Sequence, residues 1–111
     1  MVIKSSNPFG SRTRNRTLLA LRLLEESHAR ELSRVLQCSL QGVQGALRSL
    51  ERDGLIAARS VGRTRLFRLD PRYFAARELA TFLARLLEPD DQLRRATSGL
   101  RRRPRRAGKR G

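Results

Sequence analysis

The sequence contains little of what enzymes and metal sites are commonly built from. Its 111 residues include one cysteine, one histidine and no tryptophan, and they contain no glycine-rich loop able to cradle a phosphate. The single cysteine, Cys38, cannot form an internal disulfide, and these few groups do not make a convergent catalytic or metal-binding set. We therefore expect no catalysis, no bound metal and no cofactor, and we expect Cys38 to be a small buried residue.

Long apolar segments are also absent. No stretch approaches the roughly 18 consecutive apolar residues that a membrane-spanning helix needs. The first residues likewise lack the apolar core of a secretory signal peptide. These absences predict a cytoplasmic, nucleoid-associated protein without a membrane partner.

Negative charge is scarce, since 25 lysines and arginines stand against 10 acidic residues, for a formal net charge of +15. Nine of the basic residues and none of the acidic ones lie in residues 94–111. This distribution favours nucleic acid as the partner, and the end of the chain is too charged to fold unaided. A solubilising tail is the alternative to a disordered arm that contacts DNA phosphates through Arg101, Arg102, Arg103, Arg105 and Arg106.

Residues 39–53 form the most informative predicted helix. Ser39 is suited to cap its start, and Gly54 lies where a left-handed turn would end it. One face of this helix is apolar, while the opposite face carries amide and guanidinium groups that can bind base edges in the major groove of DNA. An ordinary solvated helix face is the alternative interpretation. The predicted DNA-binding residues are Ser39, Gln41, Gln44, Gly45 and Arg48.

The flanking segments favour the DNA-binding interpretation. Residues 29–36 read as a short helix, and the tight connection to the next helix matches a helix-turn-helix. Residues 55–59 and 64–69 read as antiparallel strands around a loop at 60–63, with Gly62 in the turn. We expect Arg59, Arg63 and Arg65 near the tip of this hairpin, within reach of DNA, although such arginines also protect a sheet edge against aggregation.

Residues 9–74 resemble the ArsR-like winged helix regulators of bacteria and archaea. The resemblance is carried by FGSRTRNRTLLALRLLEES, by HARELSRVLQCSLQGVQGALRSLERDGLI and by GRTRLFRLDPRYF. It implies a dimeric transcription regulator, often a repressor, with a recognition helix at 39–53 and a wing at 55–69. The cysteine-rich motif of metal-sensing members is absent, because the matching stretch reads ELSR. A second departure is the pair Gly42 and Gly45, which each cost the helix about 1 kcal/mol relative to alanine.

Two further helices carry more apolar surface than a small domain usually buries alone. The helix predicted at 12–26 is apolar on several sides, and the helix predicted at 71–87, with Pro71 in its first position, has a broad apolar stripe. We expect them to form a twofold dimer interface, the alternative being that the last helix closes the core of the monomer. The predicted interface residues are Leu19, Leu23, Leu79, Phe82, Leu83 and Leu86.

Together these patterns predict a mainly α-helical winged helix-turn-helix with a small β-hairpin wing, a C-terminal dimerisation helix and a basic disordered tail. The expected organisation is a flexible lead-in at 1–10, the DNA-binding domain with its flanking helices at 11–88, and the tail at 89–111. The predicted function is a homodimeric transcriptional regulator, a repressor, that binds double-stranded DNA, with no identifiable small-molecule effector. Two alternatives stay open: a sequence-neutral nucleic-acid binder driven by the tail, and an antitoxin-like or adaptor protein.

Overall fold

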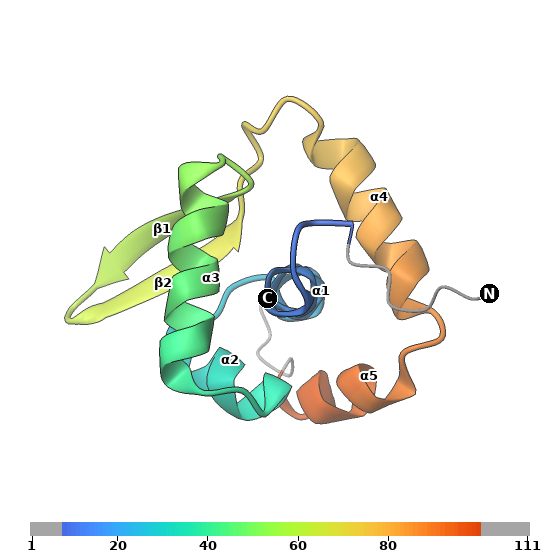
Figure 1. Ribbon diagram of the computed structural model, residues 1–111, viewed down its shortest axis with the longest axis horizontal. Helices are drawn as coiled ribbons and strands as arrows, with labels where there is room; N and C mark the ends of the chain where they lie inside the picture. Colours follow the sequence, from blue (N-terminus) through green and yellow to red (C-terminus); the bar gives the residue numbers. More distant parts are fainter. Residues whose placement is uncertain (1–7, 101–111) are drawn as a thin grey trace, which may run out of the picture.

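A computed structural model describes residues 8–100 as five helices and one β-hairpin (Figure 1). Viewed end-on, α1 occupies the centre of the molecule and the other elements surround it. The mainly helical fold with one hairpin is as predicted. In chain order the elements are α1 (Arg12–Leu24), α2 (Ala29–Leu36), α3 (Leu40–Arg52), β1 (Ile56–Val61), β2 (Thr64–Leu69), α4 (Ala76–Leu87) and α5 (Asp91–Ser98).

The central position of α1 follows from its sequence, in which leucines point in several directions. Leu18, Ala20 and Leu21 are fully buried, and α1 contacts α2, α3, β2, α4 and α5. Full burial of a leucine side chain contributes about 1.5–3 kcal/mol, so this helix supplies much of the hydrophobic stabilisation. The helix begins after Ser11, whose hydroxyl accepts a hydrogen bond from the Arg14 amide, and ends at Leu24, two residues before the predicted end.

The helix-turn-helix formed by α2 and α3 agrees closely with the sequence analysis. His28 caps α2 by accepting a hydrogen bond from the Glu31 amide, and Gln37 ends this helix in the left-handed conformation. Ser39 then caps α3 by accepting from the Gly42 amide at 3.0 Å. Gly54 adopts a φ of 84° after the last turn of α3, as its predicted role requires.

The hairpin has a shorter turn than predicted. Its strands extend to Val61 and Thr64, which pair directly, so the turn contains two residues and not the four at 60–63. Gly62 permits this because its φ is 63°, a conformation that most other residues avoid. At the other end, Phe67 exchanges two backbone hydrogen bonds with Ser27, which joins the hairpin to the segment between α1 and α2.

The start of α4 differs from the prediction. The helix begins at Ala76 and not at Pro71, because a turn forms first around Asp70. The Asp70 carboxylate accepts a hydrogen bond from the Arg72 amide at 2.9 Å, and the Asp70 carbonyl accepts one from the Tyr73 amide at 3.1 Å. The hydrogen bond from the Arg72 amide also lowers the pKa of Asp70 below its usual value.

A second difference is α5, which lies within the segment 89–111 that was predicted to be a largely disordered tail. Asp90 caps this helix by accepting from the Leu93 amide, and the side chains of Leu93 and Thr97 are each 1% exposed. The helix packs on α1 and α2, so the expected beginning of the tail at residue 89 is wrong for this segment. The tail arginines from Arg101 onward, and most of the expected lead-in, lie outside the described residues.

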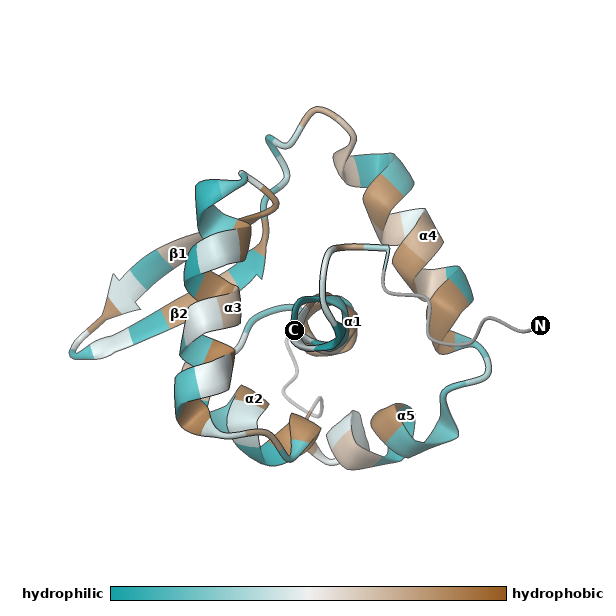
Figure 2. Ribbon diagram, viewed as in Figure 1, coloured by the Kyte–Doolittle hydropathy of each residue, from teal (hydrophilic) through white to brown (hydrophobic). Residues whose placement is uncertain are grey.

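Part of the expected dimer interface is used within one chain. Leu19, Leu79 and Leu83 are 5%, 7% and 0% exposed, so their assignment to an interface is wrong. The reason is that α4 packs on α1 and closes the core of the monomer, with Arg22 Nε donating to the Ala80 carbonyl at 3.1 Å. Apolar residues recur along α4 (Figure 2). Three of the predicted interface residues keep exposed surface, namely Phe82, Leu23 and Leu86.

Candidate nucleic-acid interface

The candidate interface begins with α3, whose two faces differ in polarity. Val43, Leu47 and Leu50 are at most 1% exposed and pack on the core. The side chains of Gln41, Gln44 and Arg48 are exposed on the outer side. This helix therefore offers amide and guanidinium groups to a partner while it is anchored from behind.

A groove of about 530 Å³ lies between α3, the start of α2 and the hairpin. Gln44 and Arg48 line it from α3, and Arg63 and Arg65 line it from the hairpin. Four of the predicted site residues from two elements therefore meet in one place. The arrangement is suited to a polyanionic ligand, because cationic side chains face each other across a concave surface.

Arg30, which is not among the predicted site residues, lines the same groove from the first turn of α2. Its position in the sequence carries no signal of this role, since it precedes the expected recognition helix by nine residues. Only the folded arrangement brings the start of α2 opposite the hairpin. Among the described residues, no carboxylate forms an ion pair with Arg30, Arg48 or Arg63.

Three other predicted residues of α3 and its cap lie outside the lining of the groove. Gln41 is exposed in the first turn, and the Ser39 hydroxyl is engaged as the helix cap. Gly45 is half-buried, and a methyl group added there would meet only Arg48 Nη2, at 3.9 Å. Packing within the chain therefore does not require glycine at this position.

Arg59 lies on the opposite face of the hairpin from Arg65. Side chains alternate along β1, and Arg59 pairs with Leu66 on the face away from α3. Its guanidinium donates two hydrogen bonds to Glu26, at 2.8 and 2.9 Å. This contact lowers the pKa of Glu26 and raises that of Arg59. The prediction that Arg59 accompanies Arg63 and Arg65 at the tip is wrong, because the strand alternation separates them.

Arg65 joins the hairpin to α3. Its Nη2 lies 3.0 Å from Oε2 of Glu51, and its Cζ lies 5.4 Å from the centre of the Phe67 ring. The guanidinium is thus held between a carboxylate of α3 and an aromatic ring of β2. These contacts connect the hairpin to the last turn of α3.

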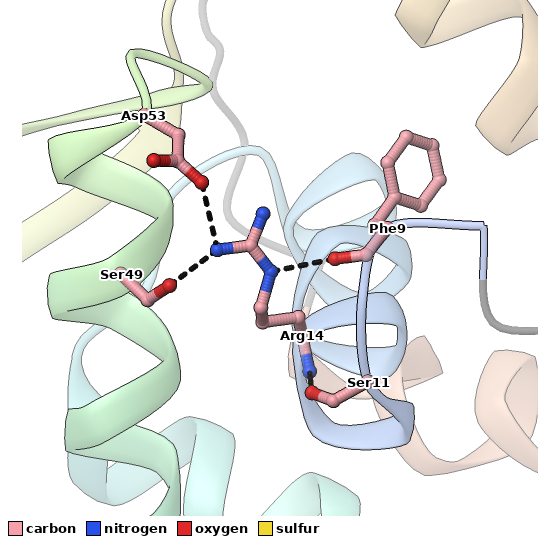
Figure 3. Close-up of polar contacts among 5 residues, drawn as sticks. All are labelled: Phe9, Ser11, Arg14, Ser49 and Asp53. Carbon is pink, nitrogen blue, oxygen red and sulfur yellow. Dashed lines mark hydrogen bonds and ion pairs between the residues drawn. The ribbon is translucent and has the colours of Figure 1, made fainter.

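Arg14 contacts the same C-terminal end of α3 from the side of α1 (Figure 3). Its Nη1 lies 3.0 Å from Oδ2 of Asp53, the residue that follows α3, and also donates to the Ser49 hydroxyl. Its Nε donates to the Phe9 carbonyl, and its backbone amide donates to Ser11. With its side chain only 18% exposed, Arg14 connects the start of α1 to the last turn of α3. The C-terminal end of α3 is therefore connected both to the hairpin and to the start of α1.

No group of three or more histidine, cysteine or acidic side chains within residues 8–100 is arranged to hold a metal ion. Over the same residues, no helix has the length and apolar character needed to cross a membrane. Cys38 is half-buried at the junction of α2 and α3, with Sγ 3.5 Å from the Leu36 carbonyl.

No protein-family model matches this chain, and a search of curated proteins finds no match. Solved structures do match. The adhesin competence repressor AdcR from Streptococcus pyogenes aligns with a TM-score of 0.58 and 20% identity, over 88% of this chain and 71% of that chain. A mutant of ZitR from Lactococcus lactis aligns with a TM-score of 0.57 and 22% identity, over 91% of this chain and 72% of that chain. The predicted winged helix fold is thereby confirmed.

Proposed function

We propose that this protein is a DNA-binding transcriptional regulator that places α3 in the major groove. The observation that carries the proposal is the meeting of Gln44, Arg48, Arg30 and Arg63 in one groove beside the recognition helix. A repressor role is supported by the name of one structural neighbour. Assignment to the ArsR-like branch rests on the residue pattern, and the absent cysteine motif separates this chain from the metal-sensing members.

The proposed contacts divide into base reading and backbone binding. Gln44 and Arg48 have side chains suited to hydrogen-bond adenine and guanine edges. Arg30 and Arg63, at the two edges of the groove, are proposed to bind phosphates. Gln41, in the first turn of α3, is proposed to reach the major groove as well. Ser39 at the cap of α3 and Gly45 near its middle are proposed to approach the DNA closely. Arg59 is left out of the proposed contacts because Glu26 holds it on the other face.

Removal of residues 101–111 is expected to weaken binding to all duplex DNA about equally. Arginines in this segment are proposed to contact phosphates without reading sequence, and each lost contact lowers the salt slope by about 0.9. Fluorescence polarisation would compare the full chain with residues 1–100, which keep every described helix, on DNA upstream of its own gene and on scrambled duplex.

The same measurement separates the regulator from its alternatives. A regulator retains a preference of about a thousandfold or more for its own site at physiological salt. If the full chain binds both duplexes equally and residues 1–100 do not bind them, the sequence-neutral binder would be favoured. The two glycines of α3 are also compatible with that alternative. If residues 1–100 bind DNA only weakly and the protein is a monomer, the antitoxin-like or adaptor alternative would be favoured instead.

We further propose that the protein acts as a homodimer through the exposed part of α4. Phe82 is 43% exposed, and its ring lies 5.9 Å from that of Phe9, with Leu86 and Leu23 partly exposed as well. A symmetric dimer would present two recognition helices to half-sites about 34 Å apart.

Substitution of Phe82 by glutamate is expected to shift the protein from dimer to monomer, because a charge would replace a large apolar side chain at the centre of the proposed contact. Sedimentation equilibrium measures the change. Thr81→Glu is the matched control, since Thr81 is exposed on the adjacent position of α4. A monomeric wild type, or an unchanged dimer in Phe82→Glu, would contradict the proposed interface.

A further inference from the structure

Glu51 is out of place in a groove proposed to hold DNA. Among the described residues that line the groove it is the only acidic one, and it faces the same space as Arg30, Arg48, Arg63 and Arg65. A carboxylate near a phosphodiester backbone weakens binding through charge repulsion. The presence of an acidic side chain in this groove therefore needs a physical explanation.

The geometry around Glu51 connects it to one arginine. Its Oε2 lies 3.0 Å from Nη2 of Arg65, and the two side chains are 34% and 54% exposed. Arg65 also lies over the ring of Phe67, which is 6% exposed and anchored through its backbone to Ser27. The ion pair thus crosses from α3 to a part of β2 that is itself fixed.

The other arginines of the groove differ from Arg65 in their ion pairing. No described carboxylate forms an ion pair with Arg30, Arg48 or Arg63. Those three guanidinium groups are available to a ligand at once, whereas Arg65 must first exchange Glu51 for a phosphate. One of four cationic groups in the groove is therefore neutralised from within the chain.

We infer that Glu51 is a positioning residue that holds Arg65 away from the DNA backbone and thereby limits the affinity of the groove for DNA of any sequence. The inference rests on the proposed function. In a protein with a net charge of +15, unrestrained binding to random DNA would compete with binding to a specific site. The ion pair reduces that competition and leaves recognition to Gln44 and Arg48.

Replacement of Glu51 by glutamine tests the inference, because it removes the charge and nearly preserves the shape. The full-length Glu51→Gln variant is expected to bind scrambled duplex about fivefold more tightly at 0.15 M salt, with a salt slope steeper by about 0.9, as one added phosphate contact requires. Fluorescence polarisation over a range of salt concentrations measures both quantities. A change in folding alone would not steepen the slope.

Two further variants identify the cause. Glu88→Gln removes the same charge from an exposed ion pair with Arg85 on α4, and it is expected to leave the salt slope unchanged. In an Arg65→Ala background, Glu51→Gln is expected to lose most of its gain in affinity and its change in salt slope, because no guanidinium remains to be released. An equal gain in that background would mean that Glu51 repels DNA directly, and this result would overturn the positioning role.

The failure of this inference can be told apart from failure of the proposed function. If wild-type protein binds neither duplex, the regulator proposal and this inference both fall. If wild-type protein binds DNA and Glu51→Gln binds with the same affinity and slope, only the role of Glu51 is overturned.

Discussion

Replacement of Arg48 by alanine is expected to weaken binding to the specific DNA site by about tenfold to a hundredfold, the loss typical of one bidentate contact with a base. Arg48 lies on the exposed face of α3, lines the groove beside Gln44 and has no ion pair with a described carboxylate. Binding to scrambled duplex is expected to fall by only about fivefold, the effect of one phosphate contact at physiological salt. Fluorescence polarisation on both duplexes at one salt concentration measures the difference.

Arg77→Ala is the matched control for this prediction. Arg77 is an exposed arginine on α4, so its loss changes the net charge equally without changing the groove. We expect its effect on either duplex to stay within about twofold, since a distant exposed charge is largely screened. Equal losses in Arg48→Ala and Arg77→Ala would show that Arg48 contributes only general charge, and it would then leave the set of base-reading residues.

Replacement of Leu93 by alanine is expected to lower the free energy of unfolding by about 2–5 kcal/mol, the range for a buried leucine in a core. Leu93 is 1% exposed and belongs to the hydrophobic core, although it lies on the short helix α5 near the end of the described chain. Small domains have a total stability of about 5–15 kcal/mol, so this loss would be a large fraction of it. Urea unfolding followed by circular dichroism suits the measurement, because the chain has no tryptophan.

Leu100→Ala provides the comparison for Leu93→Ala. Leu100 is 38% exposed and follows α5, so its truncation is expected to change the free energy of unfolding by less than about 1 kcal/mol. If both variants unfold at the same urea concentration as the wild type, α5 does not contribute to the stability of the core. That result would agree with the prediction from sequence that the ordered part of the chain ends near residue 89.

The helix-turn-helix and the hairpin were predictable because their signals are local. Ser39 as a cap, Gly54 as a left-handed terminus and the apolar positions of α3 act within one or two helical turns. Gly62 acts in the same way on the hairpin. The exposed positions of Gln44 and Arg48 follow from the periodicity of α3 alone, so these candidate site residues could be named before the fold was known.

The candidate site was predicted less completely because it is assembled from separate elements. Arg30 enters the groove only when α2 packs against α3 and the hairpin folds back toward them. Arg59 leaves it because the strand alternation and Glu26 place it on the other face. Arg59 and Glu26 are 33 positions apart in the sequence, and so are Arg30 and Arg63, so no local pattern reports that these pairs are neighbours.

The sequence by itself determined the order of helices and strands from α2 to β2, the polarity of α3 and the excess of positive charge, since these depend on local backbone preferences, periodicity and composition. The tertiary structure decided which leucines were left for a partner, because α4 and α5 pack around α1 and bury Leu19, Leu79, Leu83 and Leu93 within one chain. It also decided which arginines are free to bind, because an ion pair such as that between Glu51 and Arg65 exists only once α3 and β2 lie side by side. Burial and ion pairing are properties of neighbours in space, and the order of residues along the chain does not specify those neighbours directly.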